Sequence, residues 1–189
     1  MTTILIDADY VDRFVFELTV NFERMLERRI QKLDLSRWVD YLALDAGLRP
    51  GDEKEIQVIM LYTPQHHRLK NCLPDNLDSQ LNATAIQTNI AEFCFASHPA
   101  PEDLVDLPTL YEQSLTSLLD EKPNRMLLVA DLESYATPLK HIISQAPRET
   151  AITLFTPTET VGFKCQQEIL TYSLMAAMNI SGTELDRLK

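Results

Sequence analysis

The sequence has 189 residues, of which 45% are hydrophobic, and a formal net charge of −11 at pH 7. That length and apolar content suit one core, and the acidic balance counts against a broad nucleic-acid-binding face, because phosphates attract a basic surface. The apolar runs are too short to span a bilayer and the three scattered cysteines form no disulfide framework, so we expect a cytoplasmic protein. We also expect a single domain over residues 1–180, followed by a tail over residues 181–189.

The chain opens with an apolar run over residues 3–6 that predicts a buried strand, and Asp7 and Asp9 follow where that strand would leave the sheet. Apolar residues spaced three and four apart then predict a long helix over residues 10–33. Asp9 is placed to cap this helix. Basic residues, Arg13 among them, give its other faces a positive bias. Its length makes a second copy of the chain a candidate packing partner.

The next segments predict a helix over residues 36–46 and a strand over residues 55–62. The strand leads into the most basic short stretch of the sequence, which contains His66, Arg68 and Lys70. This stretch would lie at the same sheet edge as the first acidic pair, where its side chains could contact a phosphate backbone. A solvated loop accounts for them as well.

The rest of the chain alternates helical and apolar segments. Helices are predicted over residues 77–89, 110–119, 135–144 and 163–178. Strands are predicted over residues 90–97, 125–130 and 151–155. A proline-rich, acidic link containing Glu102 and Asp103 follows the first of these strands.

Five strands alternating with helices predict an α/β fold, a three-layer sandwich with a mainly parallel five-stranded sheet covered on both faces. Connections between such strands are right-handed, and the chain must reverse direction once to cover both faces. The strand order 3-2-1-4-5 meets this requirement. It places strands one and four side by side, at the point where such sheets bind their ligands.

Acidic residues follow strands one and four in matching positions: Asp7 and Asp9 after the first, Asp131 and Glu133 after the fourth. Two carboxylates at roughly 4 Å and an effective dielectric near 20 repel by about 4 kcal/mol, so four of them would retain protons or hold a cation. Oxygen ligands of this kind suit Mg²⁺ or Mn²⁺, which can activate water for phosphodiester cleavage. Taken singly, each acid can also be a helix cap.

Three stretches of the sequence resemble the NYN/PIN-like family of metal-dependent ribonuclease domains. Residues 4–7 (Ile-Leu-Ile-Asp) resemble the family's first strand with its leading aspartate, and Trp38 to Leu42 lie where the family often has a short helix. Residues 127–133, followed by Pro138-Leu139, resemble its apolar strand, Gly-Asp-x-Asp motif and downstream Pro-Leu pair. The resemblance implies a PIN-like fold and a Mg- or Mn-dependent endoribonuclease activity. Its implied catalytic residues are Asp7, Asp131 and Glu133, and its implied metal ligands are Asp7, Asp9, Asp131 and Glu133.

The sequence departs from the family pattern at several positions. Ala130 stands where the family has glycine, Glu133 stands where it has a second aspartate, and the spacing to Pro138 is two residues longer than usual. The asparagine that often follows the first aspartate is absent, with Asp9 nearby. The family also uses an acid from the segment after strand three, for which the sequence offers Glu102, Asp103 and Glu112 without distinguishing among them.

Two functions therefore stay open. The first is a Mg- or Mn-dependent ribonuclease that holds RNA through His66, Arg68 and Lys70. The second is a non-catalytic PIN-like interaction or regulatory protein, a homodimer through the long N-terminal helix. The two acidic pairs favour the first function, and the acidic net charge and altered motif favour the second.

Overall fold

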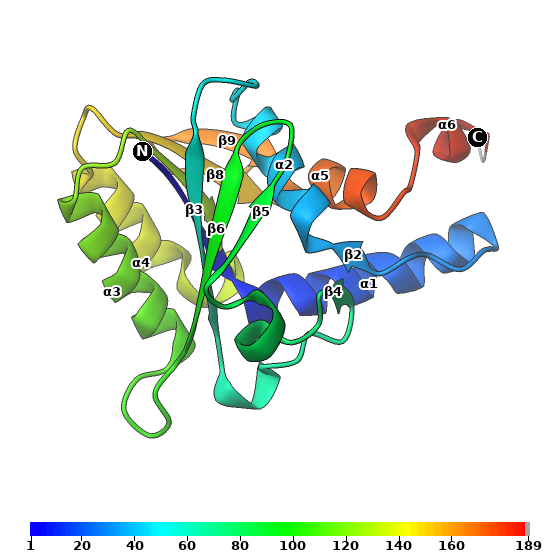
Figure 1. Ribbon diagram of the computed structural model, residues 1–189, viewed down its shortest axis with the longest axis horizontal. Coiled ribbons are helices and arrows are strands. Elements are labelled where there is room, and N and C mark those ends of the chain that lie inside the picture. The colour runs from blue at the N-terminus through cyan, green and yellow to red at the C-terminus, as the bar shows by residue number, and fades with distance from the viewer. Residues whose placement is uncertain (188–189) are drawn as a thin grey trace.

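The fold is built on a seven-stranded sheet, seen in a computed structural model that describes residues 1–187 (Figure 1). The strands of this sheet are β1 (Thr2–Asp7), β3 (Glu55–Tyr62), β5 (Thr84–Gln87), β6 (Glu92–Pro99), β7 (Arg125–Val129), β8 (Ala151–Thr156) and β9 (Gln166–Ile169). A separate two-stranded ladder pairs β2 (Leu33–Asp34) with β4 (Cys72–Leu73).

Helices cover both faces of the sheet (Figure 1). They are α1 (Ala8–Leu26), α2 (Leu35–Asp45), α3 (Leu107–Asp120), α4 (Leu132–Gln145), α5 (Leu170–Ala177) and α6 (Gly182–Asp186), with short turns η1 (Pro64–His66) and η2 (Leu77–Leu81). Side chains of β1 alternate between the two faces. Ile4 and Ile6 join the core cluster with α1, α2 and α5, whereas Leu5 joins the cluster with α3 and α4. The expected α/β sandwich with a mostly parallel sheet is confirmed.

The strand order is β5-β6-β3-β1-β7-β8-β9, and every pair is parallel except β5 with β6. The predicted count of five strands is wrong, because the sheet has seven and is mixed. The five predicted strands are its central five, β6-β3-β1-β7-β8, in the expected relative order. The two additional strands, β5 and β9, are short edge strands of four residues each.

Three predicted helices differ from the structure. Residues 77–89 form η2 and the edge strand β5, because Thr84 to Gln87 alternate half-buried and exposed side chains along β6. The closing helix begins at Leu170, after β9. The first helix ends at Leu26, since Glu27 is left-handed (φ 51°) and the apolar Leu33 is buried in β2.

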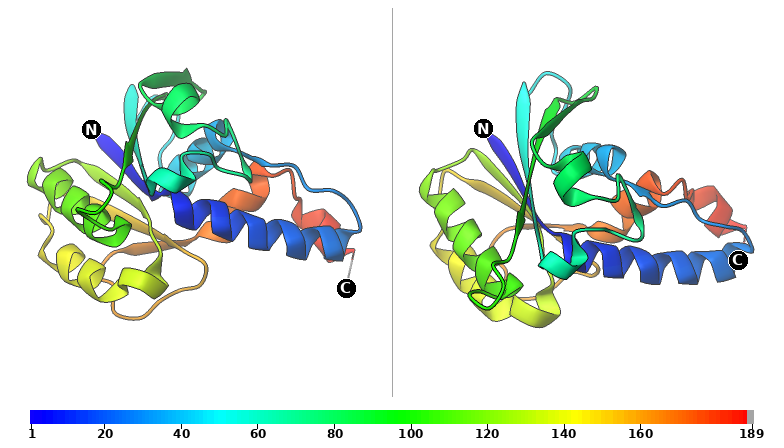
Figure 2. Two further views of the ribbon diagram at one scale, coloured as in Figure 1. Left: turned by 90° about the horizontal axis from the view of Figure 1, so that it is seen from below. Right: turned by 60° about the horizontal axis from the view of Figure 1, so that its bottom comes forward.

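The C-terminal segment is helical where a frayed tail was expected. Ser181 caps α6, and Glu184 in α6 pairs with Arg28 just past the end of α1, with Nε and Oε1 2.8 Å apart. Figure 2 shows α1 extending beyond the sheet with α6 beside its far end. Residues 188 and 189 of the predicted tail lie outside the described residues.

Two further expectations concern the environment of the chain. None of the helices within residues 1–187 has the length and apolar character needed to cross a bilayer. The three cysteines are free thiols; Cys72 is buried, and Cys94 and Cys165 are half-buried.

Candidate functional site

The candidate site lies where β1 and β7 end side by side. Ile6 pairs with Val129 in the parallel register, so Asp7 and Asp131 leave the sheet at the same edge. The chain continues from β1 to β3 on one side and from β7 to β8 on the other. This divergence makes the β1/β7 edge the topological switch point of the sheet, the usual position for a ligand site.

Asp7 is buried and bonded through both carboxylate oxygens. Its Oδ1 accepts a hydrogen bond from the backbone N–H of Tyr10 (2.9 Å), so Asp7 caps α1, the role that the sequence suggested for Asp9. Its Oδ2 accepts a hydrogen bond from the hydroxyl of Tyr135 (2.6 Å). Burial raises the pKa of Asp7 to about 6; these two hydrogen bonds oppose the rise, and the charges of Asp9 and Asp131 add to it.

Tyr135 connects the two acidic strand ends. Its hydroxyl also accepts a hydrogen bond from the backbone N–H of Asp131 (3.1 Å). The ring packs at a tilt against Tyr111, whose own hydroxyl donates to the carbonyl of Leu5 (3.1 Å). The backbone of α4 is non-helical at Tyr135 (φ −144°, ψ 32°), and Pro138 in the next turn has no N–H to donate to the carbonyl of Ser134.

Asp131 is a helix cap with a positively charged partner. Its Oδ1 accepts from the backbone N–H of Glu133 (3.0 Å) at the start of α4. Its Oδ2 accepts from the hydroxyl of Ser134 (2.7 Å) and from Nη2 of Arg13 on α1 (2.9 Å). Burial opposes the ionisation of Asp131, but the bonds from Ser134 and Arg13 outweigh it and lower its pKa.

Asp9 is bonded to the segment that follows β3. It accepts from the backbone N–H and the hydroxyl of Thr63 (3.2 and 2.7 Å), and its Oδ2 lies 2.9 Å from Nδ1 of His66. The carboxylate of Asp9 therefore holds the Thr63–His66 turn against the first turn of α1.

No three of the four predicted metal ligands bring their carboxylate oxygens within 4.8 Å of one another. Within residues 1–187, one group of three or more His, Cys, Asp or Glu side chains has its ligand atoms within 4.8 Å of one another: Glu55, Glu92 and Cys94. Glu55 and Glu92 are the first residues of β3 and β6, and Cys94 lies two residues further along β6. This group is therefore at the opposite end of the strands from the predicted site. At the predicted site, Asp131 has the guanidinium of Arg13 beside it, and Glu133 is exposed.

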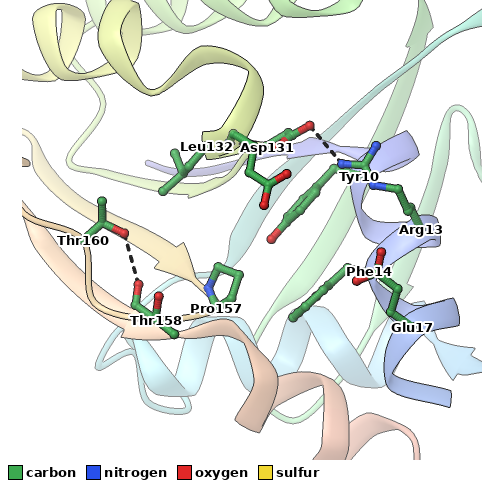
Figure 3. Close-up of a pocket in the computed structure, with 10 residues that line it drawn as sticks. Tyr10, Arg13, Phe14, Glu17, Asp131, Leu132, Pro157, Thr158 and Thr160 are labelled. Carbon is green, nitrogen blue, oxygen red and sulfur yellow. Dashed lines mark hydrogen bonds and ion pairs between the residues drawn. The ribbon is translucent and has the colours of Figure 1, made fainter. Parts of the chain in front are cut away.

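A cavity of about 370 Å³ opens at the switch point, between the start of α1, the start of α4 and the segment after β8 (Figure 3). Figure 3 shows Arg13 and Tyr10 on one side of it and Pro157 and Thr158 on the other. Its lining residues are Tyr10, Arg13, Phe14, Glu17, Asp131, Leu132, Glu133, Pro157, Thr158 and Thr160. Of the predicted site residues, Asp131 and Glu133 line this cavity.

A second cavity of about 430 Å³ lies on the other side of α1 and shares Arg13 with the first. The three predicted substrate-binding residues line it together, along with Asp9: His66, Arg68 and Lys70. Two of them already have acidic partners, since His66 contacts Asp9 and Arg68 pairs with Asp75 (3.1 Å).

The structure separates the three candidate acids after the third predicted strand from this site. Glu102 and Asp103 line another cavity, beside Pro64. Glu112 lies in α3. None of the three lines the switch-point cavity.

Sequence reasoning missed the two residues that complete the acidic network, Arg13 and Tyr135. Arg13 follows Asp9 by four positions, which places both on one face of α1 near the strand end; this spacing indicates where Arg13 lies but not that Asp131 is its partner. Tyr135 gave no such signal, because its contact depends on the break in α4.

Comparison with known proteins gives one match. Residues 1–185 match a protein family described as a family of unknown function (DUF6621). No curated protein gives a significant match, and no solved structure does.

Proposed function

The chain belongs to the DUF6621 family, and from its geometry we propose that it is a non-catalytic, PIN-like binding protein whose site is the switch-point cavity. The ion pair between Arg13 and Asp131 supports this proposal most directly. A metal-dependent nuclease would use Asp131 to hold a divalent cation. Here the guanidinium of Arg13 supplies the positive charge beside that carboxylate.

The other acids support the same function, because they too are bonded to protein groups. Asp7 is shared between the Tyr10 amide and the Tyr135 hydroxyl, and Asp9 holds Thr63 and His66. Carboxylates with such partners have structural roles that need no metal.

Ribonuclease activity is the second candidate function. The charges of Asp9 and Asp131 both act to raise the pKa of Asp7, which is the electrostatic strain that a cation would relieve. The Arg13 side chain is 54% exposed, so it can swing away into solvent and a tightly bound metal could take its place beside Asp131.

Thermal unfolding with and without Mn²⁺ separates the two functions. We expect no rise in melting temperature and no cleavage of RNA by the wild type. A rise that the double variant Asp7→Asn/Asp131→Asn abolishes, together with metal-dependent cleavage, would establish the ribonuclease and refute the binding protein.

The Arg13→Met variant tests the role of the guanidinium in the same assay. It removes the charge and keeps much of the stem, so Asp131 loses its positive partner. If Arg13 excludes cations, Mn²⁺ raises the melting temperature of this variant more than that of the wild type. The matched control is Arg24→Met, an exposed arginine further along α1 whose one side-chain hydrogen bond within residues 1–187 is to Asn21. Equal responses of both variants would argue against a blocking role.

The cytoplasmic location and the homodimer remain part of the proposal. Three free thiols without a disulfide fit a reducing compartment. The exposed apolar side chains of α1, Phe16, Val20 and Met25, fit packing against a second copy.

A further inference from the structure

We propose that the switch-point cavity binds a small organic cation, an ammonium or guanidinium group on an apolar stem. This inference rests on the proposed binding function and names the ligand class for the same site. Three properties of the cavity carry it: the sign of its charge, the composition of its walls and its size.

The charge of the lining is negative after internal pairing. Arg13 is the one basic residue of the lining and it pairs with Asp131. Glu17 on α1 and Glu133 on α4 are the remaining charged residues, and their carboxylates make no hydrogen bond or ion pair within the described part of the chain. Two unpaired carboxylates on opposite helices disfavour a phosphate group and favour a cation between them.

The walls provide apolar and aromatic surface for the rest of a ligand. Leu132 and Pro157 contribute apolar surface. The half-buried ring of Phe14 stacks on Tyr10 with centroids 5.8 Å apart and planes 8° apart. The Arg13 guanidinium lies 5.7 Å from the ring centre of Tyr10, a distance at which an aromatic ring attracts a cation.

The size of the cavity suits a small molecule. A volume of about 370 Å³ lies at the lower end of the range of ligand pockets. Within residues 1–187, neither Glu17 nor Glu133 belongs to a group of three or more potential ligand side chains that could hold one metal ion. Two carboxylates in a cavity that also has apolar walls match a ligand that carries its charge on a carbon stem.

Isothermal titration calorimetry with agmatine and cadaverine tests the proposal, with pentanediol as a neutral probe of the same stem and adenosine monophosphate as an anionic probe. We expect agmatine or cadaverine to bind the wild type and the other two probes not to bind. Absence of binding by both cations, equal binding of pentanediol, or preferential binding of adenosine monophosphate would overturn the inference.

A charge-matched pair of variants locates the site. The double variant Glu17→Gln/Glu133→Gln should weaken cation binding by about tenfold or more, because it removes both unpaired charges. The control is Glu121→Gln/Glu149→Gln, which makes the same change in net charge at exposed positions near the starts of β7 and β8. Equal loss in both double variants would mean that only the overall charge of the protein matters, and would refute the site.

A third arm distinguishes a free ligand from a side chain of a protein partner. A blocked tripeptide with a central arginine carries the same guanidinium on a peptide backbone. Tighter binding of the tripeptide than of agmatine would assign the cavity to an arginine of a partner, and the reverse would assign it to a free metabolite. Failure of all cations, with no response to Mn²⁺, would refute the ligand class and leave the binding-protein proposal standing.

Discussion

The hydroxyl of Tyr135 donates a 2.6 Å hydrogen bond to Oδ2 of Asp7, a residue 128 positions earlier in the chain. The same hydroxyl accepts from the amide of Asp131. One phenol therefore joins the end of β1 to the start of α4 and fixes the geometry of the switch point. The protonation of Asp7 is thereby tied to the stability of the fold.

Stability should fall as pH rises through about 6 because of Asp7, whose pKa is raised to that value from 3.8. The folded state then binds a proton that the unfolded state has lost, so this stabilisation is complete below the unfolded pKa and disappears above the folded one. The total is about 3 kcal/mol, at about 1.4 kcal/mol per unit of pKa. Urea denaturation between about pH 4 and pH 7 measures it.

The Asp7→Asn variant isolates this contribution from those of other titrating groups. Its stability should decline less steeply with pH over the same range than that of the wild type, since asparagine has no proton to lose. Parallel pH profiles for the two proteins would contradict a raised pKa at Asp7.

Replacing Tyr135 with phenylalanine should destabilise the protein by about 1–3 kcal/mol, because the Asp7 carboxylate loses a donor and the Asp131 amide loses an acceptor. The bond from Tyr135 also lowers the pKa of Asp7, so its loss should move the decline in stability to higher pH. Tyr172→Phe, at a side chain 69% exposed, is the control. Urea midpoints that coincide for both variants would show that the phenol contributes nothing.

Replacing Asp9 with alanine should loosen the Thr63–His66 turn, because the amide and hydroxyl of Thr63 lose their acceptor. We expect faster hydrogen exchange at the Thr63 amide and a loss of about 1–2 kcal/mol in unfolding free energy. The comparison is Asp120→Ala, an exposed acid at the end of α3. Unchanged exchange at Thr63 would contradict the assigned role of Asp9.

Light scattering should find a homodimer if α1 packs against a second copy. Phe16 is 55% exposed and Val20 48%, one turn apart on that helix. Changing both to serine should give a monomer, whereas Val161→Ser, in a loop and 90% exposed, should leave the dimer intact. A monomeric wild type at every concentration would remove the homodimer from the proposal.

Most central strands were predictable because they bury a continuous apolar run, as Ile4 to Ile6 show; β6 instead alternates buried and half-buried side chains. The edge strands were not. Residues 166–169 read Gln-Gln-Glu-Ile and residues 84–87 read Thr-Ala-Ile-Gln, and a four-residue edge strand buries too few side chains to give a clear pattern. The helix over residues 10–33 was overextended for a related reason, since the spacing of apolar residues does not reveal the left-handed Glu27 that ends α1.

The position of the site could be predicted from the sequence, but the side chains that pair with its acidic residues could not. Asp7 and Asp131 could be placed together because neighbouring parallel strands end at one edge. The ion pair of Asp131 could not be foreseen, because the flexible side chain of Arg13 could reach several acids from the same helical position. Tyr135 reaches Asp7 from a break in α4, and local pattern does not predict such breaks.

The two edge strands of the seven-stranded sheet, β5 and β9, are each four residues long. Short edges offer few free backbone groups to an incoming chain, so they protect against the edge-to-edge pairing that leads to aggregation. Self-assembly of this protein by strand addition is therefore disfavoured.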